Sequence, residues 1–199
     1  MATAPIEVGT QGAHFARYIA AMRALWAEDP ASAAAGAPAF VARARALLEE
    51  LLRETPPDEP WAAGLLADRV SARELYRDPD HGFIQMGHFH GPATPGAQMG
   101  GVPHDHGPLW VLYGVYRGGI EITRYRRTDD GRDPARATLE QVEVATITPG
   151  TVQPYLAGEV HRTRQLSPDG SVVLRFLSGD LERVARYRYD LATGQRTRL

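Results

Sequence analysis

The sequence predicts an all-β barrel of the jelly-roll type with an N-terminal α-helical segment. Through roughly the first eighty residues, apolar side chains recur at spacings of three and four, which is typical of amphipathic helices. After Gly82 the pattern changes to short alternating runs separated by Gly, Pro and Asp, which is typical of antiparallel strands. We therefore expect a helical segment, 1–80, packed on a β-barrel, 81–199, within one domain.

Two long helices and one short helix are expected in the N-terminal segment. Apolar residues keep a helical period through 14–28 and again from Pro38, a suitable first-turn residue, to the stop at Thr55. A short helix is expected over 61–76. The Ala-rich stretch 31–37 is a linker candidate.

The barrel is expected to be built from short strands joined by turns. Turn residues cluster at 128–134 and at 167–170. The expected strands cover 83–90, 109–116, 120–126, 141–147, 172–177 and 183–189.

Composition excludes several classes of function. The 22 basic residues, all Arg, nearly balance 24 acidic ones, so no field gathers a nucleic acid or an anionic membrane. The absence of Lys and Cys excludes an internal Schiff base, a thiolate nucleophile and disulfides. Without a signal-peptide pattern or a membrane-length apolar run, we expect a cytoplasmic protein with neither nucleic acid nor membrane as a partner.

A His-x-His unit, His104–Asp105–His106, is the first candidate for chemistry. Residues two apart on a strand point to the same face, where two neutral imidazoles can hold one metal ion. The unit alone is weak evidence, because an exposed strand can carry two histidines without a ligand.

The surrounding residues resemble the first motif of the cupin superfamily. That motif runs Gly, five residues, His-x-His, three or four residues, Glu, six residues, Gly; His104, His106 and Gly118 fit it. Gln98 stands at the opening Gly and Val111 stands at the Glu. The usual carboxylate ligand is therefore missing.

The second cupin motif is also matched in part. It runs Gly, five residues, Pro-x-Gly, two residues, His, three residues, Asn; Gly150, Gly158 and His161 fall in register. Leu156 replaces the Pro and Gln165 replaces the Asn, where it is expected to support the loop after His161. Two half-motifs in a β-rich chain are stronger evidence than either one.

Together the motifs imply that His104, His106 and His161 hold one divalent metal. A three-histidine set resembles the thiol dioxygenases, which implies Fe(II), dioxygen and a small anionic substrate such as a thiol, oxidised to a sulfinate. The resemblance covers the chain from about Tyr76 and includes the trailing run 186–190. Three imidazoles leave the metal its full charge and open positions, and zinc, nickel or manganese are alternatives.

The chain departs from that group where a Ser-x-His-x-Tyr run would supply a catalytic hydrogen-bond network. The corresponding stretch is 173–177, Val-Leu-Arg-Phe-Leu. His88 and His90 form a second His-x-His on a probable strand and share a face with Met86, so we predict that they line the pocket and handle protons. The alternative is a hydrogen-bonded or surface pair.

Three further residues are candidates for binding substrate. Arg77 precedes the strand at the place where the resembled enzymes carry a carboxylate-gripping Arg, and Arg175 is expected to project inward. Tyr113 could place a hydroxyl near bound oxygen. Each has an alternative as a solvent-facing arginine or a core aromatic.

Two other functions stay open on the sequence alone. One is a non-oxidative metallo-cupin, an isomerase, lyase or hydrolase using zinc, manganese or nickel, whose activity would not need oxygen. The other is a cupin that binds a small ligand without turnover. Either a monomer or a homodimer is expected.

Overall fold

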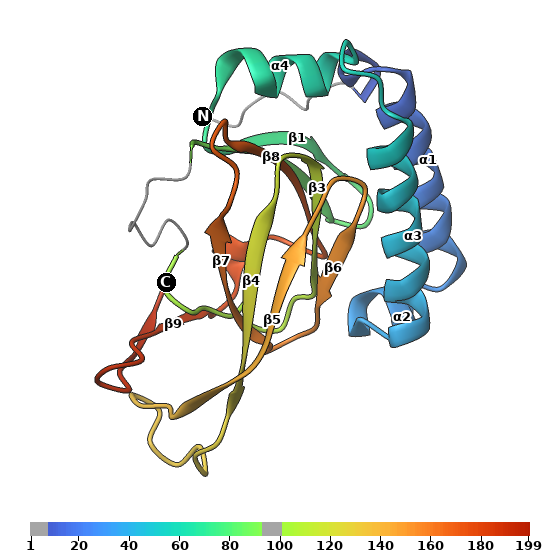
Figure 1. The fold of residues 1–199 in the computed structure, drawn as a ribbon. Coiled ribbons are helices and arrows are strands. Elements are labelled where there is room, and N and C mark those ends of the chain that lie inside the picture. Colours follow the sequence, from blue (N-terminus) through green and yellow to red (C-terminus); the bar gives the residue numbers. More distant parts are fainter. Residues whose placement is uncertain (1–7, 93–100) are drawn as a thin grey trace.

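The computed structural model describes residues 8–92 and 101–199. It contains two antiparallel sheets that enclose a barrel interior, with helices packed on the outside of one sheet (Figure 1). The predicted fold class, a jelly-roll barrel or double-stranded β-helix with an N-terminal helical segment, is confirmed.

The two long predicted helices are confirmed as α1, Ala13–Glu28, and α3, Pro38–Glu54. The predicted linker is wrong, because it forms most of a short helix, α2, Pro30–Ala35. The Asp29 carboxylate caps this helix by accepting the N–H of Ser32 at 3.0 Å, and Gly36 ends it in the left-handed conformation. Within the described residues, no helix is long and apolar enough to cross a membrane.

The third predicted helix is wrong over its second half. Helix α4, Pro60–Asp68, ends at Arg69, whose φ of 50° is left-handed. The chain then forms strand β1, Arg73–Arg77, which pairs antiparallel with the next strand. Leu75 is fully buried there, so its apolar signal comes from sheet packing and not from a helix. The segment 1–80 thus contributes one strand to the barrel.

The larger sheet has the strand order β1-β2-β8-β3-β6, and the smaller sheet has the order β5-β4-β7. A short pair, β9 and β10, follows at the C-terminal end. The strands span Ile84–His90 (β2), Val111–Arg117 (β3), Ile120–Arg127 (β4), Leu139–Ile147 (β5), Val152–Tyr155 (β6), Val160–Gln165 (β7), Ser171–Leu177 (β8), Tyr187–Tyr189 (β9) and Arg196–Arg198 (β10).

Five predicted strands are confirmed, and the sixth is shorter than predicted. The stretch 183–189 begins at the end of a 3₁₀ turn, Leu181–Arg183, and only β9 is extended. Strands β6 and β7 were not predicted. Strand β6 contains Pro154, which disfavours a strand, and strand β7 is mostly polar. The 3₁₀ turn Val8–Gln11 precedes α1.

Alternation along β8 separates two cores. Leu174 and Phe176 pack with the helices, whereas Val173 and Leu177 belong to the core inside the barrel. Gly87 lets the helical layer approach closely, because a Cβ there would lie 2.6 Å from Leu65 Cδ1. The helices therefore cover the outer face of the larger sheet, and the side chains on its inner face form the core inside the barrel.

A polar network around Asp78 joins helix α1 to the turn between strands β1 and β2. Asp78, fully buried, accepts N–H groups of Asp80 and His81 and pairs with Arg23 of α1. Burial alone would raise the pKa of Asp78, but these donors and the Tyr76 hydroxyl outweigh it and hold the pKa below its ordinary value.

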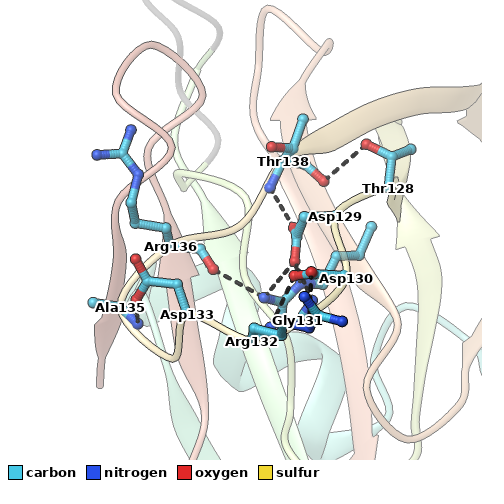
Figure 2. A network of polar contacts seen from close by, with 10 residues as sticks. Thr128, Asp129, Asp130, Gly131, Arg132, Asp133, Ala135, Arg136 and Thr138 are labelled. Carbon is cyan, nitrogen blue, oxygen red and sulfur yellow. Dashed lines mark hydrogen bonds and ion pairs between the residues drawn. The ribbon is translucent and has the colours of Figure 1, made fainter.

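The turn between β4 and β5 is built around Asp129 (Figure 2). Its carboxylate accepts the N–H groups of Gly131 at 2.8 Å and of Thr138 at 2.6 Å, and pairs with Arg127. The Arg127 guanidinium and these donors hold the Asp129 pKa well below its usual value. The turn predicted over 128–134 is therefore present and internally satisfied.

Candidate metal centre

His104, His106 and His161 come together inside the barrel. One ring nitrogen from each lies within 4.8 Å of the others. The backbones of His104 and His161 exchange both hydrogen bonds of an antiparallel bridge, at 2.9 and 3.0 Å. Residues opposed in this way project to one face, so the bridge brings two sequence-distant histidines to the same place.

The ring nitrogens are available for a metal. Burial, together with neighbouring positive charge, lowers the pKa of all three histidines, so the imidazoles are neutral near pH 7. The Nδ1–H of His104 donates to the Val102 carbonyl at 3.2 Å, which leaves Nε2 as a donor to a metal. His106 Nδ1 and both nitrogens of His161 are buried without a hydrogen-bond partner.

This donor set fits a divalent transition metal. Three neutral imidazoles suit iron, zinc or nickel, and buried unpartnered nitrogens carry a cost that coordination would remove. Val111, at the position of the missing carboxylate, is fully buried in the interior core. Gln98, the other departure from the first motif, lies outside the described residues.

Asp105, between two of the histidines, anchors their segment to the C-terminal strand. Its buried carboxylate accepts the N–H groups of Gly107 at 2.8 Å and Tyr187 at 3.1 Å. The Tyr189 hydroxyl donates to it at 2.5 Å. Burial, followed by this contact, raises the pKa of Tyr189 to about 12. These hydrogen bonds to strand β9 thus fix the position of the His-x-His unit.

His161 is held by stacking instead of by a hydrogen bond to its ring. Tyr155 lies against it with ring centroids 3.7 Å apart and planes 20° from parallel. The Arg124 guanidinium sits 4.6 Å from the Tyr155 centroid and forms ion pairs with Glu143 and Glu159. This stack fixes the plane of the imidazole.

Two of the predicted substrate-binding residues, Tyr113 and Arg175, lie on the strands that face the barrel interior. Met86 and Tyr113 both pair with Arg175 across the central strands, and the Arg175 Nη1 donates to the Tyr113 hydroxyl at 3.5 Å. That hydroxyl lies 3.3 Å from His106 Nε2. Arg175 and Tyr113 therefore adjoin the histidine cluster.

His88 and His90 stack on one another, with centroids 5.8 Å apart. The Nδ1–H of His88 donates to the Ser71 carbonyl at 2.9 Å, and its Nε2 is buried without a partner. Burial, then the charge of Arg175, lowers the pKa of His88 to about 3. A neutral ring with a free lone pair is therefore available to accept a hydrogen bond.

The structure does not bring Arg77 to the cluster. It lies in β1, its side chain is 45% exposed, and its guanidinium pairs with Glu74 and Asp180. A clamp for substrate needs a free guanidinium beside the reacting centre. The same role is open to Arg175.

Sequence reasoning missed four residues that support the site. Arg124, Tyr155 and Asp105 act through contacts between segments far apart in the chain, which no local pattern reveals, although Asp105 stands inside the His-x-His unit itself. Arg186 is the fourth. Burial is the largest cause of the lowered pKa of His104 and His106, and the charge of Arg186 lowers both further. From the sequence, Arg186 was noted only as part of the run 186–190 that resembles the thiol dioxygenases.

The loop predicted after His161 is instead the rest of strand β7, and Gln165 stands at the end of that strand. Its amide donates to the His90 carbonyl at 3.3 Å, and its oxygen accepts from the Ser171 hydroxyl at 2.9 Å. It thus joins the strand of one metal-site histidine to the strands that carry His90 and Arg175.

No family model matches the sequence, and no curated protein matches it either. Among solved structures, KdgF from Halomonas sp. aligns with a TM-score of 0.39 at 17% identity, over 55% of this chain and 78% of KdgF. The cupin domain of Schizosaccharomyces pombe Cnp3 gives 0.41 at 8%, over 55% of this chain and 60% of that one. A cupin domain of an XRE-family transcriptional regulator from Enterobacter cloacae gives 0.37 at 17%, over 53% and 92%. Similarity at this level carries no inference about activity.

Proposed function

We propose that the protein is a mononuclear non-haem Fe(II) dioxygenase that acts on a small anionic substrate. The observation that supports this most is the cluster of three neutral imidazoles, two of them buried, beside an arginine that forms no ion pair within the described residues. His104, His106 and His161 would hold the metal. When bound, ferrous iron supplies open coordination positions and the redox chemistry that dioxygen requires.

The chain's own residues have separate roles in this proposal. Arg175 binds the substrate's acid group through a charge-assisted hydrogen bond, which partial burial strengthens by lowering the local dielectric constant. His88 accepts a hydrogen bond from the substrate at its free Nε2, and His90, stacked on it, limits its motion. The Tyr113 hydroxyl orients groups between Arg175 and His106.

A small thiol is the first substrate class to test, because the three-histidine set resembles that of the thiol dioxygenases. The reaction would add both atoms of O₂ to sulfur, R–SH + O₂ → R–SO₂H, with the thiol as the only reductant. His88 would take part in moving the thiol proton.

Oxygen uptake tests the proposal. Protein loaded with Fe(II) is mixed with a panel of small thiols and other small anions, and oxygen consumption is recorded with an electrode. Uptake that depends on substrate and disappears in His161→Ala supports the proposal, and Arg175→Gln should raise KM more than it lowers kcat. Turnover that persists without oxygen in zinc-, manganese- or nickel-loaded protein would instead establish a non-oxidative metalloenzyme.

A further inference from the structure

Arg175 brings a positive charge to the histidine cluster through the Tyr113 hydroxyl, which lies beside His106. Arg175 lies inside the barrel, and its Nε is buried with no hydrogen-bond partner. Within residues 8–92 and 101–199, no Asp or Glu forms an ion pair with it. A guanidinium in such a setting is costly unless a ligand neutralises it.

A second arginine, Arg186, immediately precedes strand β9, which runs beside the His-x-His unit. The neighbouring Tyr187 and Tyr189 pack together in a separate apolar cluster, so alternation turns Arg186 and Arg188 to the opposite side. The register agrees, because His104 is bridged to Arg188, and residues opposed in an antiparallel pair share a face. Arg186 therefore lies on the face that carries His104.

The backbone contacts support this placement. The Asp105 N–H donates to the Tyr187 carbonyl at 3.0 Å, and the Tyr189 N–H donates to the Pro103 carbonyl at 2.8 Å, so the segment that carries Arg186 runs alongside the His-x-His unit. The Asp105 carboxylate, between His104 and His106, is already engaged by Tyr189 and two backbone N–H groups. Arg186 is partly buried and, in the described part of the chain, has no ion-pair partner.

We propose that the pocket takes a substrate with two acid groups, one bound by Arg175 deep in the barrel and the other by Arg186 on strand β9's side of the cluster. A dicarboxylate, or a small molecule of the same charge, satisfies both guanidinium groups, whereas a monoanion leaves one unpaired. This inference rests on the proposed function of the same pocket, because it concerns the substrate of that metal centre.

Matched ligand pairs test the proposal. Zinc-loaded protein is titrated by calorimetry with malonate, succinate, glutarate and adipate, each compared with its monomethyl ester, which has the same skeleton and one charge fewer. At least one diacid should bind about tenfold or more tightly than its ester, since a charge-assisted pair contributes at least that factor. Equal binding of every diacid and its ester would overturn the proposal.

Variants assign the preference to Arg186. Arg186→Gln should bring the diacid-to-ester ratio to about one and leave ester binding unchanged, while Arg186→Lys should retain much of the ratio. Arg117→Gln, at the exposed end of β3, makes the same change in net charge away from the pocket. If Arg117→Gln lowers the ratio as much as Arg186→Gln does, Arg186 is not the second site.

Metal content and oxygen uptake are measured on the same preparations. A metal-loaded, oxygen-consuming protein without diacid preference would refute this inference and leave the proposed function standing. A protein that prefers diacids but consumes no oxygen with iron and any substrate would refute the oxygenase and leave the two-arginine site standing.

Discussion

Replacing Tyr155 with Leu should weaken metal binding about tenfold, whereas Tyr155→Phe should leave it unchanged. The ring is stacked on His161 at 3.7 Å, and neither nitrogen of that imidazole has a hydrogen-bond partner to fix its plane. An aromatic stack contributes roughly 0.5–1.5 kcal/mol beyond its buried area, and loss of groups that orient a ligand typically costs 10–100-fold in affinity. Leu keeps the apolar volume but removes the flat surface.

The two variants also separate the ring from the hydroxyl. The Tyr155 hydroxyl is buried without a partner, so removing it in Tyr155→Phe should leave the free energy of unfolding unchanged or raise it by up to about 1 kcal/mol. Zinc affinity is measured by competition with a chromophoric chelator, and stability by urea unfolding of the metal-free protein. Wild-type affinity in Tyr155→Leu, or equal losses in both variants, would refute the role of the stack.

Three further predictions concern the barrel and its supports. Asp105→Asn should lower the free energy of unfolding by about 2–4 kcal/mol, because an amide cannot accept all three donors that the carboxylate accepts, and should reduce metal loading. Asp78→Asn should reduce the drop in the free energy of unfolding that the wild type shows below about pH 4. Folding lowers the Asp78 pKa, so the ionised carboxylate stabilises the folded state above its unfolded-state pKa, and this stabilisation is lost as the pH falls. Gly87→Val should destabilise by about 2 kcal/mol or more, because the new side chain meets Leu65 and Leu75.

Each of these has a matched control and a contradicting outcome. Tyr189→Phe removes one of the three donors to Asp105 and should cost less than Asp105→Asn; an equal or larger cost would contradict the shared-acceptor account. Asp78→Asn should retain the wild-type pH profile above pH 6, and an unchanged acid limb would show that other carboxylates set it. Gly91→Val, where no atom lies within 4 Å of an added Cβ, is the control for Gly87→Val, and an equal loss of stability in the two variants would contradict the packing argument.

The sequence predicted most of the fold because its signals are local. The period of 14–28 and the alternation of 83–90 each follow from which face is buried, and α1 and β2 match them closely. Strand β7 was missed because five of its six residues, from His161 to Gln165, are polar or charged, although the structure buries His161 and Gln165. The end of the short helix at Arg69 depends on a left-handed residue that no periodicity reveals.

The centre of the candidate site was also predictable, whereas its surroundings were not. Motif spacing brought His104, His106 and His161 together in the prediction, and the structure places them within reach of one ion. Arg77 was predicted to bind substrate because it occupies the position of an arginine in the thiol dioxygenases. In the folded chain its guanidinium instead forms ion pairs with Glu74 and Asp180, which the sequence alone does not reveal.

The most direct test of the account is metal stoichiometry by elemental analysis. Wild-type protein reconstituted anaerobically with Fe(II) and desalted should retain close to one iron per chain, and so should His81→Ala, whose ring lies against Trp26 of α1, outside the barrel. His161→Ala should retain almost none, while keeping a cooperative unfolding transition. Full iron loading in folded His161→Ala, or no retention by the wild type, would contradict the three-histidine metal centre.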